Sequence, residues 1–555
     1  MAALNNPQAK KPGRKEINAV LRKVFGIAAL RDGQRQVIDS VLSGSDTLAV
    51  MPTGSGKSLC YQLPARLLQG RGLTVVVSPL ISLMKDQAEK LEEAGIASAA
   101  QINSSLSRSA ELAALEGIES ADHDIVFCTP ERLVTPEFLA LLQQSVVALV
   151  VIDEAHCISQ WGHDFRPAYL EIGAALAALG RPQVLALTAT ATDEVITDIR
   201  TQLGRPRMAV INTGIYRPNL HYRVRQVTNP DEKAAQALQL VRETAGVGII
   251  YAATVKAAEE MYTLLENAGE SVALYHGKLR AAERSENQNL FMSGERRVMV
   301  ATNAFGMGID KPDTRFVIHL QVPANLEAYY QESGRAGRDG LDAQCTLLYY
   351  HADKRLQQFF LIKHYPQPHE LRAVYEAAAA LAAEGERTFT AADLKPKLAQ
   401  IAASQLTICL KMLKDGKLLK RSRKLDYALA PQSAGAVPKE ALFAHLAQVY
   451  ADKHQRDREG LEQMVGYAQS GYCRWKLLLD YFGDQSPGFE QCCRCDNCLA
   501  PPAIGAAPIA LATATPTVQA ETPQVHPAAA PLHVVAPGVT SLGMPTAAPR
   551  TAAAA

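Results

Sequence analysis

The sequence lacks an excess of charge of either sign. Its 555 residues contain 57 Lys and Arg against 56 Asp and Glu, which leaves a formal net charge of +1. This balance excludes a histone-like protein that binds nucleic acid through its overall charge, and it also excludes an acidic, solvated chain. It does not exclude a local basic surface, because a basic stretch can be averaged out in a neutral total.

The sequence also lacks a long apolar run. It has no uninterrupted stretch of about 18 apolar residues, the length that a membrane-spanning helix requires. Residues 1–16 are polar, carry a basic run and contain no apolar signal-peptide core. We therefore expect a cytoplasmic protein with no membrane partner. In such reducing surroundings, clustered cysteines favour a metal ion over a disulfide.

Hydrophobic patterning predicts two α/β units. After an expected flexible arm at residues 1–16, short β-branched runs alternate with amphipathic stretches over 17–206 and again over 207–350. Near-continuous apolar runs of this kind indicate parallel strands that are buried on both faces. We expect strands at 47–51, 73–79, 124–130, 146–155 and 183–190 in the first unit, and at 247–253, 271–276, 296–303, 315–323 and 343–350 in the second.

The strand pattern ends after residue 350. Residues 351–437 predict a helical segment and a winged-helix-like unit with a basic turn. Within it, residues 411–424 carry seven basic residues and one acidic residue, which is typical of a DNA-binding surface or of a solvated charged face. Residues 438–499 predict helices that lead into a cysteine cluster. Residues 500–555 are rich in Ala, Pro and Thr and predict a disordered tail.

A glycine-rich loop follows the first predicted strand. It reads Thr53, Gly54, Ser55, Gly56, Lys57 and Ser58, and a predicted helix begins directly after it. Glycines let backbone N–H groups approach phosphate oxygens, and the following helix adds a partial positive charge. The pattern predicts ATP binding, with Lys57 at the β and γ phosphates and Ser58 as a ligand of Mg²⁺.

Two carboxylates follow another predicted strand. Asp153 stands at its tip and is expected to bind Mg²⁺, and Glu154 is expected to activate the attacking water as a general base. Adjacent residues of a strand point in opposite directions, so the chain must turn there if both are to serve one site.

Five of the ten cysteines lie between residues 473 and 498. Cys473, Cys492, Cys495 and Cys498 supply four thiolates, a set that suits tetrahedral Zn²⁺. Cys493 is a fifth candidate, but choosing it would break the regular two-residue spacing of the last three ligands. With all four positions filled by the protein, the predicted Zn²⁺ is structural.

Several motifs together resemble a known family. DEAH at 153–156, TAT at 188–190 and QESGRAGR at 331–338 are similar to the core of superfamily 2 helicases. The longer runs DEAHCISQWGHDFRPAY (153–169) and ATNAFGMGIDKP (301–312), with the cysteine pattern, resemble the RecQ family of DNA helicases. The resemblance implies that the two α/β units are RecA-like motor domains, followed by a mostly helical accessory region with a zinc module.

The resemblance also assigns roles to further residues. Gln34 matches a glutamine that reads the adenine edge, and Arg31 matches its arginine neighbour. Arg335 and Arg338 match arginines that contact the γ-phosphate, and a guanidinium fits that geometry. Because these arginines belong to the second unit, ATP is expected to bridge the two units.

The run after Glu154 resembles the aromatic-rich loop of the family. It implies DNA binding, or coupling of DNA binding to hydrolysis, by His156, Trp161, His163, Phe165 and Arg166. Stacking of a base on an aromatic ring contributes about 1–3 kcal/mol.

The resemblance implies an ATP-dependent DNA helicase that moves 3′ to 5′ on single-stranded DNA and acts on tailed or forked duplexes in recombination, repair or replication. The order of the accessory units departs from the family, in which the winged helix follows the zinc ligands. This departure keeps open a DNA-stimulated ATPase that remodels DNA without separating strands. A non-catalytic scaffold and an RNA helicase are weaker alternatives.

Overall fold

The computed structural model describes residues 12–500 except 105, 160–165, 307–308, 363–365, 386–387, 417, 422–425, 431–439 and 485–487. The predicted tail therefore lies outside the described residues, except for Ala500. Helix α1 (Arg14–Lys23) begins inside the predicted arm of residues 1–16, because Ile17 and Leu21 are buried against helices of the first unit. No helix among the described residues has the length and apolarity to cross a membrane.

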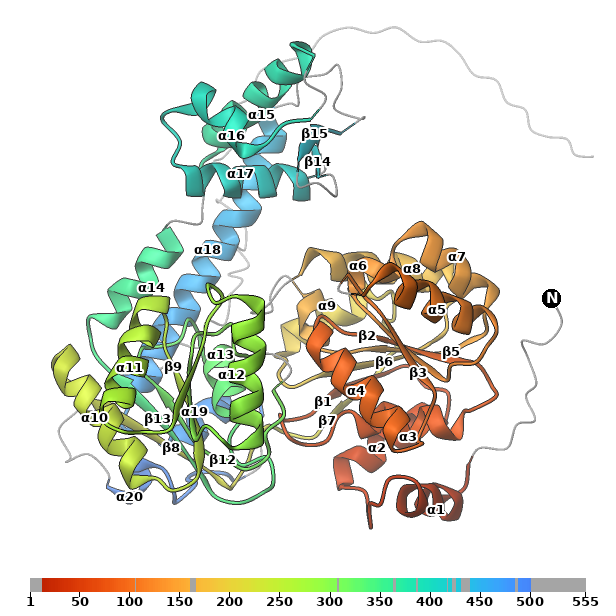
Figure 1. Ribbon diagram of the computed structural model, residues 1–555, viewed down its shortest axis with the longest axis horizontal. Helices are drawn as coiled ribbons and strands as arrows, with labels where there is room; N and C mark the ends of the chain where they lie inside the picture. The colour runs from red at the N-terminus through yellow and green to blue at the C-terminus, as the bar shows by residue number, and fades with distance from the viewer. Residues whose placement is uncertain are drawn as a thin grey trace, which may run out of the picture. The chain divides into compact units, whose positions relative to one another are not determined.

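The first unit is built on a seven-stranded parallel sheet, sheet A, in the order β3-β4-β2-β5-β6-β1-β7. Buried side chains of one face pack under α2, α3 and α4, and those of the other face pack under α5 to α9 (Figure 1). Its strands are β1 (Thr47–Val50), β2 (Leu73–Val77), β3 (Ala99–Ile102), β4 (Ile125–Cys128), β5 (Val147–Ile152), β6 (Gln183–Thr188) and β7 (Ala209–Asn212). Its other helices are α2 (Asp32–Leu42), α3 (Leu59–Leu67), α4 (Ile81–Glu93), α5 (Arg108–Glu119), α6 (Pro130–Leu133), α7 (Pro136–Gln144), η1 (Ala155–Ile158), η2 (Pro167–Glu171), α8 (Ile172–Ala178) and α9 (Asp193–Gln202).

The second unit is built on a six-stranded parallel sheet, sheet B, in the order β10-β11-β9-β12-β13-β8. Helices α10 and α11 pack on one face through Leu240, Val241, Met261 and Leu265. Its strands are β8 (Leu220–Gln226), β9 (Val247–Tyr251), β10 (Val272–Tyr275), β11 (Val298–Ala301), β12 (Thr314–His319) and β13 (Ala343–Tyr349). Its helices are α10 (Pro230–Glu243), α11 (Val255–Asn267), α12 (Ala281–Ser293) and α13 (Leu326–Ser333).

The structure confirms the predicted fold class of two parallel-sheet units, and each predicted strand run contains a strand. It adds β3, β7 and β8, which the sequence pattern missed. Strand β7 pairs with β1, so sheet A continues to Asn212 and passes the unit boundary that we predicted at residue 206.

A small unit with its own core follows sheet B. Helices α15, α16 and α17 pack against the antiparallel strands β14 and β15, and Phe389 forms an isolated antiparallel bridge with Tyr427. This order of helices and strands is that of a winged helix. The elements after sheet B are α14 (Asp353–Ile362), α15 (Pro368–Ala383), α16 (Ala391–Leu394), η3 (Lys395–Leu398), α17 (Ala403–Asp415), β14 (Leu419–Arg421) and β15 (Tyr427–Leu429).

Helix α18 (Glu440–Gln469) connects this unit to the cysteine cluster. It has 30 residues, which corresponds to a length of about 45 Å. Phe443 near its beginning belongs to the winged-helix core, and the ring of Tyr467 near its end packs at a tilted angle against Tyr329 of α13. The boundary that we predicted at residue 437 therefore does not separate two cores. The chain continues with α19 (Arg474–Tyr481) and α20 (Asp496–Leu499).

Candidate nucleotide site and cysteine cluster

The glycine-rich loop connects the carboxyl end of β1 to α3. Gly54 and Gly56 both have φ of +80°, a conformation that side-chain-bearing residues rarely adopt. The Lys57 ammonium lies 3.2 Å from the carbonyl oxygen of Met51. Burial lowers the pKa of Lys57, and the nearby carboxylates of Glu154 and Asp153 oppose this effect. The loop thus presents one half-buried amine near two carboxylates.

The chain turns at Glu154, as the sequence argument required. Glu154 has φ of 48° and ψ of 48°, so its backbone is left-handed, which costs a residue with a Cβ about 1–2 kcal/mol. This turn breaks the strand alternation, and both carboxylates line one cavity. The Asp153 carboxylate accepts a hydrogen bond of 3.3 Å from the Ser78 hydroxyl. Burial, and then the neighbouring Glu154, raise the pKa of Asp153 to about 7.

Arg335 and Arg338 follow α13 of the second unit and reach the same cavity. Arg338 donates to Asp310 over 2.7 Å, and its Cγ lies 3.0 Å from the position that a Cβ on Gly54 would occupy. Burial and the neighbouring Arg335 lower the pKa of Arg338, whereas Asp310 raises it. Arg335 and Arg338 of the second unit therefore lie opposite the glycine-rich loop of the first unit. This loop, residues 53–58, is called the phosphate loop below.

These groups surround one cavity of about 340 Å³, which lies at the carboxyl end of sheet A and, in the second unit, is lined by residues that precede β12 and β13. Such crevices are the usual ligand sites of parallel α/β folds. Sequence reasoning gave no role to several of its lining residues, although Ala189, Gln331 and the three from 309–312 lie inside motifs quoted above: Tyr61, Leu80, Leu83, Gln87, Ala189, Ile309, Asp310, Pro312 and Gln331.

Arg31 and Gln34 lie against the phosphate loop and are absent from the cavity lining. The Gln34 amide donates to the carbonyl oxygens of Ser55 and Gly56 over 2.9 and 3.2 Å, and Arg31 donates to that of Gly54 over 2.8 Å. Both side chains therefore stabilise the loop through its carbonyl groups without lining the cavity. Their expected contact with adenine stays a prediction.

His156 connects the acidic turn to β6. Its Nδ1 lies 3.0 Å from the Thr188 hydroxyl and 3.3 Å from a Glu154 carboxylate oxygen. The Thr188 hydroxyl donates in turn to the carbonyl oxygen of Thr190 over 2.9 Å. Polar contacts therefore connect the DEAH motif, through His156, to the TAT motif, through Thr188, although the two motifs are far apart in the sequence.

The predicted aromatic loop is described only at its two ends, residues 157–159 and 166–169. Trp161, His163 and Phe165 lie outside the described residues. Arg166 is described, and its guanidinium donates to the carbonyl oxygen of Pro79 over 3.4 Å. On the winged-helix unit, Lys411, Lys414 and Lys420 are exposed.

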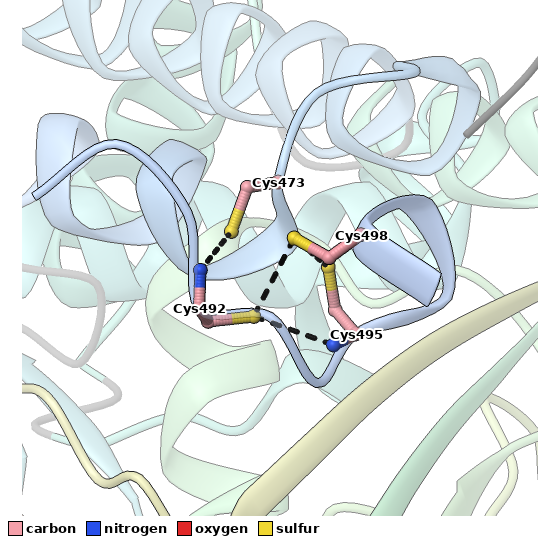
Figure 2. A group of neighbouring side chains, drawn as sticks. All are labelled: Cys473, Cys492, Cys495 and Cys498. Carbon is pink, nitrogen blue, oxygen red and sulfur yellow. Dashed lines mark hydrogen bonds between the residues drawn. The ribbon is translucent and has the colours of Figure 1, made fainter. Parts of the chain in front are cut away.

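Four cysteines meet near the end of the described chain (Figure 2). The sulfur atoms of Cys473, Cys492, Cys495 and Cys498 all lie within 4.8 Å of one another. Backbone N–H groups of Cys492 and Cys495 donate to the sulfurs of Cys473 and Cys492 over 3.2 and 3.3 Å. Cys493 is exposed and does not belong to the group. The structure thus groups the four cysteines that the spacing argument preferred.

The cluster has dimensions that suit zinc. A tetrahedral Zn²⁺ with bonds of about 2.3 Å requires sulfur atoms about 3.8 Å apart. The Cys492–Cys498 and Cys495–Cys498 sulfur distances are 3.9 and 3.4 Å. Three of the four residues are buried, as expected for a closed structural site.

The elements around the cluster cover the outer edge of sheet B at β8. Trp475 donates to the carbonyl oxygen of Leu220 over 3.0 Å, and Asp496 accepts from the backbone N–H of Val224 over 2.8 Å. Asp496 also forms a two-fold contact with Arg474 at 2.9 and 3.0 Å. The edge strand therefore has side-chain partners in place of a further strand.

Comparisons with known families match three parts of the chain. Residues 31–199 match the DEAD/DEAH box helicase family, 232–340 match the helicase conserved C-terminal domain, and 440–499 match the RecQ zinc-binding family. An ATP-dependent DNA helicase RecQ from Synechocystis is 33% identical over 503 residues, which cover 88% of this chain and 98% of that protein. This chain belongs to the RecQ family.

Other RecQ relatives match over a shorter stretch. ATP-dependent DNA helicase RecQ of Bacillus subtilis is 46% identical over 345 residues, or 62% of this chain and 58% of that protein. The probable ATP-dependent DNA helicase RecS of the same organism is 43% identical and matched over 68% of its length. This chain thus spans little more than half of some of the curated RecQ relatives that it matches.

Solved structures share the fold of this RecQ-family chain at low sequence identity. The helicase Lhr of Mycobacterium smegmatis, bound to single-stranded DNA and AMP-PNP, aligns with a TM-score of 0.52 at 20% identity and covers 75% of this chain and 60% of its own. The DUF1998 helicase MrfA, bound to DNA, aligns with a TM-score of 0.51 at 18% identity over 75% of this chain and 62% of its own.

Proposed function

We propose that the chain is an ATP-dependent DNA helicase that moves 3′ to 5′ on single-stranded DNA and separates duplexes. The observation that carries this proposal is the shared cavity. It brings Lys57, Asp153 and Glu154 of the first unit together with Arg335 and Arg338 of the second. Family membership supports the choice of DNA, and a cytoplasmic location stays a prediction.

The first unit supplies binding and general-base groups. In this proposal Lys57 contacts the β and γ phosphates, and Glu154 takes the proton of the attacking water. Ser58 and Asp153 both line the cavity and offer the oxygen ligands that Mg²⁺ prefers. When bound, Mg²⁺ neutralises charge that develops on the phosphates.

The second unit supplies the charges that favour the transition state. Arg338, the residue nearer to Gly54, acts as the arginine finger, and Arg335 supports it beside the γ-phosphate. Because hydrolysis removes the group that both units bind, the cycle of binding and release changes the contact between them.

DNA contacts are proposed from the sequence and from surface charge. Trp161 and Phe165 stack on bases, and His163 and Arg166 contact phosphate, while His156 links this loop to the Thr188 chain. The exposed lysines of the winged-helix unit bind duplex backbone.

The cysteine cluster is proposed to hold one Zn²⁺. Cys473, Cys492, Cys495 and Cys498 fill all four positions, so the metal stabilises the fold and takes no part in hydrolysis. Its physical effect is to hold α19 and α20 against β8.

A DNA-stimulated ATPase without strand separation is the second candidate. The observation that favours it is the order of the units, because the basic hairpin precedes the cysteine cluster. No described residue can be assigned the strand-separating role from the family pattern.

Strand displacement tests the two candidates. We expect the full chain with ATP to separate a 3′-tailed duplex and to leave a 5′-tailed duplex intact. Glu154→Gln should bind ATP but lose DNA-stimulated hydrolysis by at least about 10²-fold, the usual contribution of a general base. Hydrolysis without displacement would favour the second candidate, and a chain without hydrolysis would contradict both.

A further inference from the structure

Residues 213–219 join the two sheets and are called the hinge segment here. Strand β7 ends sheet A at Asn212, and β8 begins sheet B at Leu220. Arg217 stands near the end of this segment and is only 8% exposed. No catalytic motif includes it, yet a buried guanidinium needs several acceptors.

Arg217 finds its acceptors in the turn that carries the two site arginines. Its guanidinium donates to the carbonyl oxygens of Gly334, Ala336 and Gly337 over 2.7, 2.7 and 2.6 Å. Asn219, two residues further on, donates to the carbonyl oxygen of Gly337 over 2.8 Å. The turn at 334–337 follows the end of α13. Its carbonyl groups accept hydrogen bonds from the side chains of Arg217 and Asn219 in the hinge segment.

The hinge segment is itself held in place at Ile215. The Tyr330 hydroxyl of α13 donates to the carbonyl oxygen of Ile215 over 2.7 Å. The backbone N–H of Ile215 donates to the Asp484 carboxylate over 2.7 Å, just after α19. Two hydrogen bonds at Ile215 therefore fix the backbone near Arg217. From this fixed position, its rigid, planar guanidinium can determine the position of the Gly334–Gly337 turn.

We infer that Arg217 is a positioning residue for hydrolysis, which holds the Gly334–Gly337 turn so that Arg335 and Arg338 face the phosphate cavity. This inference rests on the proposed function, since it assigns Arg217 to the step that those two arginines serve. Arg217 is absent from the cavity lining, so it acts through the turn rather than on the nucleotide.

The inference predicts a specific kinetic effect. Arg217→Ala should lower the DNA-stimulated kcat for ATP by about 10²-fold, the usual effect of displacing a catalytic group by about 1 Å. The KM should rise by a smaller factor than kcat falls, because the contact of these arginines with phosphate is stronger in the transition state than in bound ATP. Arg217→Lys keeps the charge but has no planar fork, so its kcat should lie between those of the wild-type chain and Arg217→Ala.

A matched control separates positioning from general stability. Arg297 also donates to backbone carbonyls of the second unit, those of Val241 and Thr244, but it precedes β11 and is absent from the cavity lining. Arg297→Ala should lower the melting temperature while kcat stays within about twofold of wild type. If Arg217→Ala fails to fold, Arg217→Lys and Asn219→Ala carry the test.

A double-mutant comparison decides the mechanism. If Arg217 acts through the turn, Arg217→Ala combined with Arg338→Ala should lose little more kcat than Arg338→Ala alone. Losses that multiply, or an unchanged kcat in folded Arg217 variants of an active enzyme, would overturn the inference. An inactive wild-type chain would instead overturn the proposed function, and this inference with it.

Discussion

Gly54 stands where the phosphate loop passes closest to the second unit. Its φ of +80° strains any residue with a Cβ, and a Cβ there would lie 3.0 Å from Cγ of Arg338. We expect Gly54→Ala to weaken ATP binding by at least about tenfold, or about 1.4 kcal/mol, because the added Cβ would crowd Arg338 and shift the loop that binds phosphate. Equilibrium binding of a fluorescent ATP analogue measures the effect.

Gly70 provides the control for this substitution. It has φ of +79°, but a Cβ there would meet nothing within 4 Å. Gly70→Ala should therefore lower the free energy of unfolding by about 1–2 kcal/mol and leave ATP affinity unchanged. Equal affinities for the two variants would show that the close approach of Gly54 to Arg338 has no role in binding.

At the residue scale, motifs predicted the groups of the cavity but not what holds them. Lys57, Asp153, Glu154, Arg335 and Arg338 were named from the sequence, and the structure brings them to one cavity. A turn at the strand tip followed as a requirement, and the structure adds that it is left-handed at Glu154. Arg217 could not be predicted, because its acceptors lie 117 to 120 residues away and are backbone carbonyls, which carry no sequence signature.

At the element scale, strands with uniform apolar runs were predictable and three others were not. Strand β3 is rich in alanine, and β7 is short and mostly exposed, so neither gives a strong β signal. Strand β8 alternates apolar Leu220, Tyr222 and Val224 with polar residues, a signal of period two that could have found it. This strand lies at the edge of sheet B, and its outer edge meets the cysteine module.

The cysteine module leads to a prediction for this same element. We expect the purified full chain to contain about one zinc per molecule, and Cys473→Ser to lose it. Without the metal, α19 and α20 should leave β8, and the exposed edge should become sensitive to protease and prone to aggregation. Elemental analysis and limited proteolysis measure the two effects.

Cys493→Ser is the matched control, because Cys493 is adjacent in sequence but exposed and outside the group. It should keep its zinc and its protease resistance. A wild-type chain without zinc, or loss of zinc from the Cys493 variant alone, would contradict the ligand set.

At the scale of the whole molecule, the sequence predicted two similar units but not how they are joined. Strand periodicity placed the boundary at residue 206, whereas β7 extends sheet A to Asn212 and moves the connection to residues 213–219. The new position of the connection is important because residues 213–219 contact the Gly334–Gly337 turn and Asp484, which follows α19. Such contacts depend on the packing of complete units, which local sequence patterns do not encode.

This arrangement predicts that nucleotide binding in the cavity reduces the motion of the hinge segment, residues 213–219. With a saturating non-hydrolysable ATP analogue, hydrogen exchange should slow at least about tenfold in residues 213–219 and 334–338, because one charge-assisted bond to phosphate contributes about 1.5–3 kcal/mol. Arg338→Ala should keep the slowing in the phosphate loop, residues 53–58, and lose it in the hinge segment. Slowing confined to the phosphate loop of the wild-type chain would mean that ATP binds one unit without bridging to the other.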